Sequence, residues 1–156
     1  MNKTALSFDN PITLVGGAEV SADNFRESIQ FTSKVVAADG GANTCLKYGV
    51  KPEVVIGDMD SIDEISKIQI GQDAIHFVKG QDDTDFEKSL KRISAPLILG
   101  LGFLGDRLDH QMAVQTALVK HPDKKVLLIG SHDLVFLSPP EFSITLKNEC
   151  RVSIYP

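Results

Sequence analysis

Short apolar runs alternate with helix-like patterns over the first 130 residues, and this rhythm constrains the fold more than any other feature. The runs are rich in Val, Ile and Leu, as buried strands are. The segments between them carry apolar residues at helical spacing. The alternation predicts an α/β fold with a mostly parallel sheet, right-handed crossovers and helices on both faces. The predicted strands are Ile12–Val15, Val35–Ala38, Val54–Ile56, Ala74–Val78, Pro96–Leu101 and Lys125–Gly130.

The pattern changes after Ser131, where strand-like runs are separated by polar or proline-containing breaks. This change predicts hairpins, and therefore a short antiparallel β segment at the C-terminus. The three runs are Leu134–Leu137, Phe142–Leu146 and Val152–Tyr155.

Composition excludes some partners and sets the expected location. A chain of 156 residues with 42% hydrophobic residues is expected to form one domain, or one domain and part of a second. A net charge of −5 gives no electrostatic reason to bind nucleic acid or an anionic membrane. No apolar run approaches the ~20 residues that span a bilayer, and no signal peptide is visible. Cys45 and Cys150 match no zinc or redox spacing, which predicts reduced thiols and a cytoplasmic protein.

Two aspartates follow the apolar run at Val54–Ile56. Side chains alternate along extended backbone, so Asp58 and Asp60 can point the same way. Carboxylates this close repel each other unless a positive group lies between them, and Mg²⁺ is the usual one beside phosphates. The alternative interpretation is a polar turn after a strand, because Asp and Ser favour turns.

Other predicted strands also end in acidic residues. Asp39 follows one strand, with Gly40, Gly41 and Asn43 after it. The segment 82–85 opens a predicted helix, where acidic residues favour the helix dipole without any ligand. Within it, Asp82 and Asp85 are one turn apart and can face a common ligand. Since ligands bind at the carboxyl ends of parallel strands, these groups are expected to gather at one edge of the sheet.

A glycine-rich loop follows the fifth run and leads into a helix predicted from about Arg107 to Val119. Gly102 and Gly105 permit backbone amides close to a phosphate, and Arg107 can grip phosphate oxygens. Asp109 can orient His110 or cap the helix. A histidine at a helix start is more often structural or merely exposed than catalytic.

Taken together, these motifs resemble the thiamin pyrophosphokinase family. Each motif is modest alone, but their order and spacing also match, over about Leu14 to Ile129. The four motifs are Ala38-Asp39-Gly40-Gly41-Ala42-Asn43, Gly57-Asp58-Met59-Asp60-Ser61, Gln81-Asp82-Asp83-Thr84-Asp85-Phe86 and Arg107-Leu108-Asp109-His110.

The resemblance implies an enzyme that transfers a pyrophosphoryl group from ATP to the hydroxyl of thiamin, giving AMP and thiamin diphosphate. It implies Mg²⁺ as cofactor, ATP and thiamin as substrates, and a homodimer. By the same resemblance, Mg²⁺ and the polyphosphate are held by Asp58, Asp60, Asp82 and Asp85. The implied nucleotide-binding residues are Asp39, Gly40, Gly41, Asn43, Ser61, Thr84, Gly102, Gly105, Arg107, Asp109 and His110.

The catalytic group is expected to comprise Asp58, Asp60 and Asp85, with Asp60 or Asp85 as acceptor of the hydroxyl proton. The resemblance divides the chain into a nucleotide-binding catalytic domain, residues 1–130, and the start of an incomplete β-sandwich-type thiamin-binding domain, residues 131–156. Family chains usually continue past this point, so ATP binding is a firmer expectation than turnover.

The sequence also departs from the family pattern. Asp106 stands where members often have glycine before the arginine, and it is expected to turn away from phosphate. The main alternative function is a Mg·ATP-binding module without turnover. Two further alternatives are a phosphatase of the haloacid-dehalogenase type and a sugar-nucleotide glycosyltransferase, since both use Asp-x-Asp.

Overall fold

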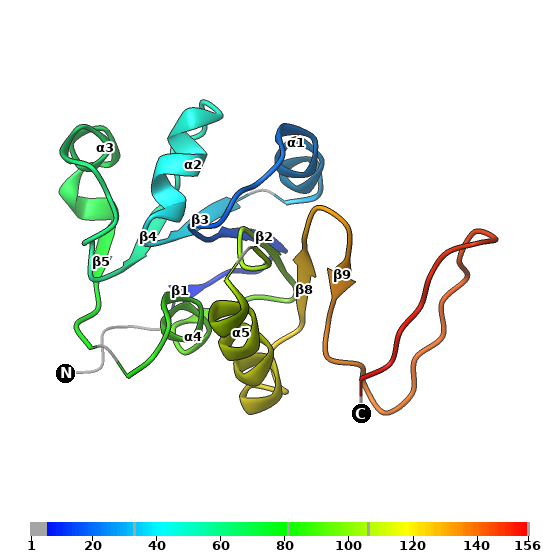
Figure 1. The fold of residues 1–156 in the computed structure, drawn as a ribbon. Helices are drawn as coiled ribbons and strands as arrows, with labels where there is room; N and C mark the ends of the chain where they lie inside the picture. Colours follow the sequence, from blue (N-terminus) through cyan, green and yellow to red (C-terminus); the bar gives the residue numbers. More distant parts are fainter. Residues whose placement is uncertain (1–5, 33, 81, 106, 156) are drawn as a thin grey trace.

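A computed structural model describes residues 6–32, 34–80, 82–105 and 107–155 and shows an α/β fold built on a mostly parallel sheet (Figure 1). The sheet has seven strands in the order β5-β4-β3-β2-β7-β8-β9, and only the β8–β9 pair is antiparallel. Its strands are β2 (Ile12–Val15), β3 (Lys34–Ala38), β4 (Val54–Gly57), β5 (Ile75–Phe77), β7 (Ile98–Leu101), β8 (Val126–Ile129) and β9 (Leu134–Val135). All six predicted strands are therefore present, and the predicted fold class is confirmed.

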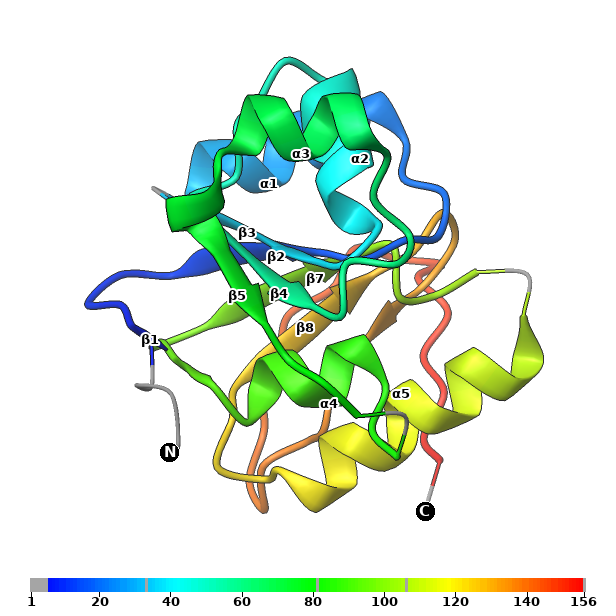
Figure 2. The ribbon, with the colours of Figure 1, turned by 90° about the vertical axis from the view of Figure 1, so that its left-hand side faces the viewer.

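Helices cover both faces of the sheet (Figure 2). On one face lie α1 (Ala22–Phe31), α2 (Gly41–Lys47) and α3 (Glu64–Ile70), followed by the 3₁₀ turn η1 (Gln72–Ala74). On the other lie α4 (Asp85–Leu90) and α5 (Leu108–Lys120). Ser21 is the N-cap of α1, because its hydroxyl accepts a hydrogen bond from the backbone N–H of Asn24.

The strand order creates a reversal point between β2 and β7. From β2 the chain adds β3, β4 and β5 on one side, and it then returns to place β7 on the other side of β2. Strands β2 and β3 pair in parallel, with Leu14 opposite Val36, and β2 pairs with β7 through Leu14 and Gly100. Their carboxyl ends therefore lie at one edge, where ligands bind in open parallel sheets.

The central strands are buried on both sides, which explains their continuous apolar runs. All four residues of β2 and of β4 are buried. Two apolar clusters result, one on each face: Phe86 and Leu90 of α4 lie in the first, and Phe25 of α1 and Cys45 of α2 lie in the second. Burial raises the pKa of the Cys45 thiol to about 12, so this group stays protonated and chemically inert.

Two predictions about local structure were wrong. The spacing of Phe86, Leu90 and Ile93 in the sequence predicts that all three lie on one face of a helix, but α4 ends at Leu90. Ile93 instead belongs to β6 (Ile93–Ser94), which pairs in parallel with β1 (Leu6–Ser7) in a separate two-stranded sheet. Ile93 is buried in the same apolar cluster as Phe86 and Leu90 of α4. It is therefore apolar because of its place in a strand, and its helical spacing from Phe86 and Leu90 is coincidental.

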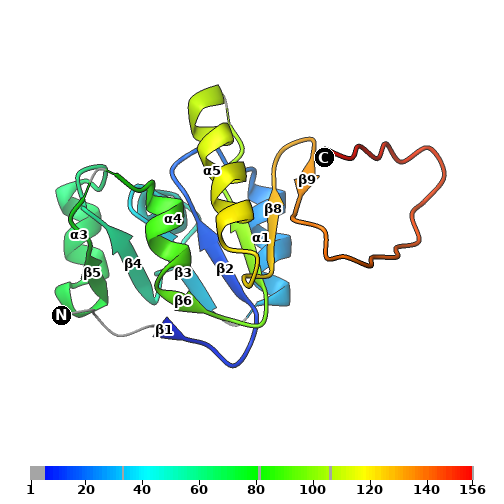
Figure 3. The same ribbon diagram turned by 90° about the horizontal axis from the view of Figure 1, so that it is seen from below.

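The second wrong prediction concerns two of the three C-terminal runs, although the predicted antiparallel segment is present as the β8–β9 pair. Of the three runs, only Leu134–Val135 forms a strand, whereas Phe142–Leu146 and Val152–Tyr155 make no ladder in the structure. Figure 3 shows the segment after β9 extending away from the sheet. A strand needs a partner for its backbone groups, and these runs lie beside none of the described strands. Within the described part of the chain, no helix has the length and apolar character needed to cross a membrane.

The packing of α2 against β2 leads to a test of the role of Gly41. A Cβ atom at Gly41 would lie 2.0 Å from the carbonyl oxygen of Val15, a backbone atom that cannot give way. We expect Gly41→Ala to lower the free energy of unfolding by about 1–3 kcal/mol, the usual cost of overpacking. Chemical denaturation followed by circular dichroism measures this change.

Gly17→Ala is the matched control, because a Cβ atom there meets nothing within 4 Å. Its free energy of unfolding should stay within about 0.5 kcal/mol of the wild-type value. Equal stability of the two variants would show that α2 does not depend on this close approach.

Candidate functional site

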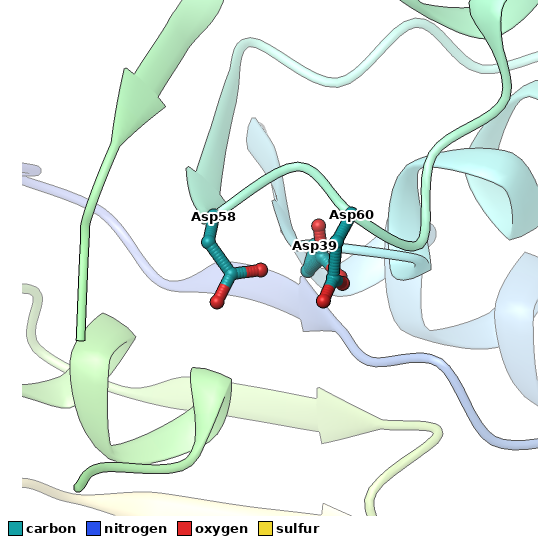
Figure 4. Close-up of side chains that lie close together, drawn as sticks. All are labelled: Asp39, Asp58 and Asp60. Carbon is teal, nitrogen blue, oxygen red and sulfur yellow. The ribbon is translucent and has the colours of Figure 1, made fainter. Parts of the chain in front are cut away.

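Three aspartates meet at the carboxyl edge of the sheet (Figure 4). Asp39 follows β3, and Asp58 and Asp60 follow β4, the neighbouring parallel strand. One carboxylate oxygen from each lies within 4.8 Å of the other two. The strand register causes this convergence. Ala38 near the end of β3 lies opposite Ile56 near the end of β4, so the segments that follow the two strands leave the sheet side by side.

The backbone around these aspartates is unusual. Asp39 and Met59 both have left-handed backbone conformations, with φ of 41° and 64°. Non-glycine residues adopt this region at an energetic cost, and they cluster at functional sites. Met59 is buried, which anchors the turn and leaves Asp58 and Asp60 on either side of it. Gly57 completes the arrangement, because a Cβ atom there would lie 2.8 Å from the Cβ of Asp39.

Asp39 is the most buried of the three carboxylates, at 2% exposure. Burial raises its pKa above the usual 3.8, and the charges of Asp85 and Asp60 raise it further, against a lowering by Ser61. Its Oδ1 atom is buried and has no hydrogen-bond partner among the described residues. Buried oxygens without partners are rare and costly, so this atom points to a missing ligand.

A second buried oxygen, Oδ1 of Asn43, also lacks a partner among the described residues. The amide nitrogen of Asn43 donates to the carbonyl oxygen of Ser61 at 3.0 Å, which fixes the side chain beside the turn. The Ser61 hydroxyl in turn donates to Asp60 at 2.9 Å. Carboxylate and amide oxygens are the ligands preferred by Mg²⁺, so the residues present fit such an ion.

The structure groups Asp58 and Asp60, as predicted, and it places Asp39 beside them. The resemblance had assigned Asp39 to the wall that holds both the nucleotide and the metal. We call Asp39, Asp58 and Asp60 the aspartate cluster. The available signal was that Asp39 and Asp58 both follow strands of a parallel sheet. Only the adjacency of β3 and β4 reveals that they face one another.

Sequence reasoning missed Lys88. Its side chain is 5% exposed, and its ammonium group donates to Asp58 Oδ2 at 3.2 Å and to Asp85 Oδ1 at 2.9 Å. Burial by itself would lower the pKa of Lys88, but the two carboxylates outweigh it and raise the pKa, so the group is charged. Burial likewise opposes ionisation of Asp58, but Lys88 outweighs it and lowers the pKa of Asp58.

The acidic segment before α4 is arranged differently from the prediction. Thr84 is the N-cap of α4, accepting from the backbone N–H of Glu87, so Asp82 lies before the helix on an exposed bend. The argument from helical spacing therefore does not apply to Asp82 and Asp85. Asp83 pairs with Lys91 through both carboxylate oxygens at 2.8 Å.

The second motif lies after β7. Arg107 is exposed and pairs with Asp109 at 2.6 Å, and His110 is exposed in the first turn of α5. These side chains do not pair with the aspartate cluster. The prediction that Asp106 turns away from phosphate concerns a residue outside the described ones. Gln81 of the third motif also lies outside them.

The predicted glycines have packing roles in the structure. Gly102 has φ of +71°, and a Cβ atom there would lie 2.6 Å from the carbonyl oxygen of Gly16, where the loops after β2 and β7 cross. A Cβ atom at Gly105 would approach Ala18 to 2.8 Å, and one at Gly40 would approach Ser61 to 3.2 Å. These glycines allow the loops after β2 and β7, and likewise the loops after β3 and β4, to approach closely at the carboxyl edge.

Residues 25–129 match the family model described as "Thiamin pyrophosphokinase, catalytic domain". The chain is 31% identical over 131 residues to thiamine pyrophosphokinase 1 of Arabidopsis thaliana, which covers 67% of this chain and 49% of the relative. It is 29% identical over 140 residues to thiamin pyrophosphokinase 1 of Caenorhabditis elegans, covering 80% and 57%. The chain therefore spans about half the length of the curated relatives it matches.

Solved structures have the same fold. Thiamine pyrophosphokinase from Bacillus subtilis superposes with a TM-score of 0.68 at 25% identity, covering 85% of this chain and 66% of that one. Thiamin pyrophosphokinase from Candida albicans gives a TM-score of 0.69 at 18% identity, covering 82% and 60%, and shows the fold alone.

The raised pKa of Asp39 predicts how stability depends on pH when no metal is present. Because the pKa in the folded protein exceeds 3.8, the folded state holds the proton more tightly than the unfolded chain. Asp39 thus favours folding at low pH, where its carboxyl group is protonated. This contribution is lost as pH rises through the pKa of Asp39 in the folded protein. We expect Asp39→Asn to raise the melting temperature by about 2–4 °C at pH 7.

The gain should shrink as pH falls toward the ordinary pKa of 3.8, which thermal unfolding in EDTA over this range can measure. Asp23→Asn, at an exposed carboxylate of α1, is the control and should leave the curve unchanged. A lower melting temperature for Asp39→Asn at pH 7 would mean that hydrogen bonds to Asp39 outweigh its burial.

Proposed function

Because this chain belongs to the thiamin pyrophosphokinase family, we propose that it transfers a pyrophosphoryl group from ATP to the hydroxyl of thiamin in a Mg²⁺-dependent reaction. The products are AMP and thiamin diphosphate. The observation that carries the proposal is the aspartate cluster at the carboxyl ends of β3 and β4, inside the segment that defines the family. The unpartnered oxygen of Asp39, a member of the cluster, supports a cation there.

The proposed cation-binding residues are Asp39, Asp58 and Asp60. Asp82 and Asp85 remain predicted contacts of the same ion or of the polyphosphate. When bound, Mg²⁺ offsets the negative charge that develops on the phosphate oxygens during transfer. The grouped carboxylate oxygens suit this ion better than a softer metal.

Positioning accounts for the rest of the proposed mechanism, because such transfers need little covalent help from the protein. Backbone amides of the loops containing Gly40, Gly41, Gly102 and Gly105 are proposed to hold phosphate oxygens. Further proposed nucleotide contacts are Asn43, Ser61, Thr84, Arg107, Asp109 and His110. The pairing of Arg107 with Asp109 holds the guanidinium at the start of α5, on the same sheet edge.

Asp60 is the proposed acceptor of the thiamin hydroxyl proton. It is exposed at the mouth of the cluster, and the Ser61 hydroxyl orients it at 2.9 Å. Asp85 is the second candidate, but its carboxylate already accepts a bond from Lys88. A general base must reach its proton within hydrogen-bond distance, which favours an exposed carboxylate.

The proposed binding of thiamin involves the C-terminal segment of the chain. We propose residues 1–130 as the nucleotide-binding catalytic domain and residues 131–156 as the start of a β-sandwich-type thiamin-binding domain. Apolar side chains of this segment are exposed, including Phe142, Ile144 and Ile154, which suits burial against further structure. A homodimer in the cytoplasm completes the proposal, with family membership as its support.

The decisive test is a chromatographic assay of the purified protein with ATP, Mg²⁺ and thiamin. We expect AMP and thiamin diphosphate in equal amounts, and we expect Asp60→Asn to reduce turnover by about 10²-fold or more while circular dichroism shows a folded protein. Asp123→Asn is the matched control, since Asp123 is exposed before β8 at the opposite edge of the sheet.

Each outcome of this assay distinguishes between functions. Wild-type turnover by a folded Asp60→Asn variant would contradict the role of the aspartate cluster. Binding of Mg·ATP without AMP formation would favour the alternative of a binding module. Release of inorganic phosphate without AMP would indicate a phosphatase instead.

A further inference from the structure

Lys88 connects the aspartate cluster to Asp85. It extends from α4, which lies against the opposite face of the sheet from α2 and α3 (Figure 2). Its ammonium group donates to Asp58, a member of the cluster, and to Asp85. The protein itself thus supplies a positive charge to Asp58 through the ammonium group of Lys88.

A buried ammonium group is costly unless carboxylates compensate for its loss of water. Lys91, the C-cap residue of α4, pairs with carboxylates at a lower cost of desolvation. Its side chain is 41% exposed, and it pairs with Asp83 and Glu87. Both lysines tie α4 to neighbouring acidic groups. They differ in that Lys88 is buried and shares one of its carboxylates with a cluster suited to a divalent cation.

We propose that Lys88 is a built-in counter-ion that competes with divalent cations for Asp58 and Asp85, and so sets how tightly the nucleotide-free protein binds them. This inference rests on the proposed function, because it assumes that the cluster holds a cation. The ammonium group and a cation compete for the lone pairs of Asp58. Their like charges also repel each other across a short distance, which weakens binding of the cation.

The competition has a consequence for the reaction. Without nucleotide, Lys88 already offsets part of the negative charge at the site, so Mg²⁺ gains little by entering alone. With nucleotide, the phosphate groups add negative charge and oxygen ligands, and the balance shifts toward the cation. Lys88 therefore favours entry of the metal together with ATP over capture of the free ion.

Mn²⁺ titration of the nucleotide-free protein tests this inference, with the signal of the free ion followed by electron paramagnetic resonance. We expect Lys88→Met, which keeps the length of the side chain and removes its charge, to bind Mn²⁺ about tenfold more tightly or better. Lys91→Met removes a charge from the same helix outside the cluster and should bind Mn²⁺ like the wild-type protein.

An ordinary structural ion pair would give the opposite result. If Lys88 only holds α4 in place, Lys88→Met lowers the melting temperature and leaves Mn²⁺ affinity unchanged or weaker, and that outcome overturns the inference. Lys88→Gln serves if the Met variant fails to fold, because it retains a polar N–H donor without the charge. It should also tighten Mn²⁺ binding.

The titration also separates this inference from the proposed function. Mn²⁺ binding by wild type with no effect of Lys88→Met or Lys88→Gln contradicts the inference alone. Absence of Mn²⁺ binding in every variant contradicts the cation site and the inference with it. The thiamin diphosphate assay reports independently on the reaction, so a failed transfer does not alter the reading of the titration.

Discussion

Repulsion among carboxylates at one edge of the sheet is the constraint on which the structure of the site depends. Asp39, Asp58 and Asp60 are held within 4.8 Å because β3 and β4 are adjacent, paired and buried. The backbone ladder fixes where the two strands end, and it therefore holds the backbone of the residues that follow them close together. Lys88 offsets part of this repulsion from the side of α4.

Much of the fold could be predicted because the strands are buried on both faces. Such strands appear in the sequence as continuous apolar runs, and the run at residues 12–15 matches β2 in both bounds. Alternation with helical patterns then implies parallel pairing, and parallel pairing places strand ends at a common edge. This reasoning predicts Asp58 and Asp60 at the carboxyl edge of the sheet, where the structure places them.

Tertiary contacts that leave no local pattern could not be predicted. Lys88 lies within a short amphipathic helix, where a lysine normally faces water, and only the approach of α4 to the end of β4 buries it. Asp39 joins the cluster because the sheet places β3 next to β4, which strand patterns alone do not specify. The apolar runs after β9 resemble strands, but strand formation requires a partner as well as a pattern.

The site also contains several features that oppose folding. Asp39 and Met59 adopt left-handed conformations, which cost about 1–3 kcal/mol each. Two buried oxygens, in Asp39 and Asn43, have no hydrogen-bond partner among the described residues. These features lie in two segments at the carboxyl edge of the sheet, with Asp39 and Asn43 after β3 and Met59 after β4. A ligand that coordinates a buried unpartnered oxygen offsets the cost of its burial, so the features that oppose folding at this edge are the ones that favour binding.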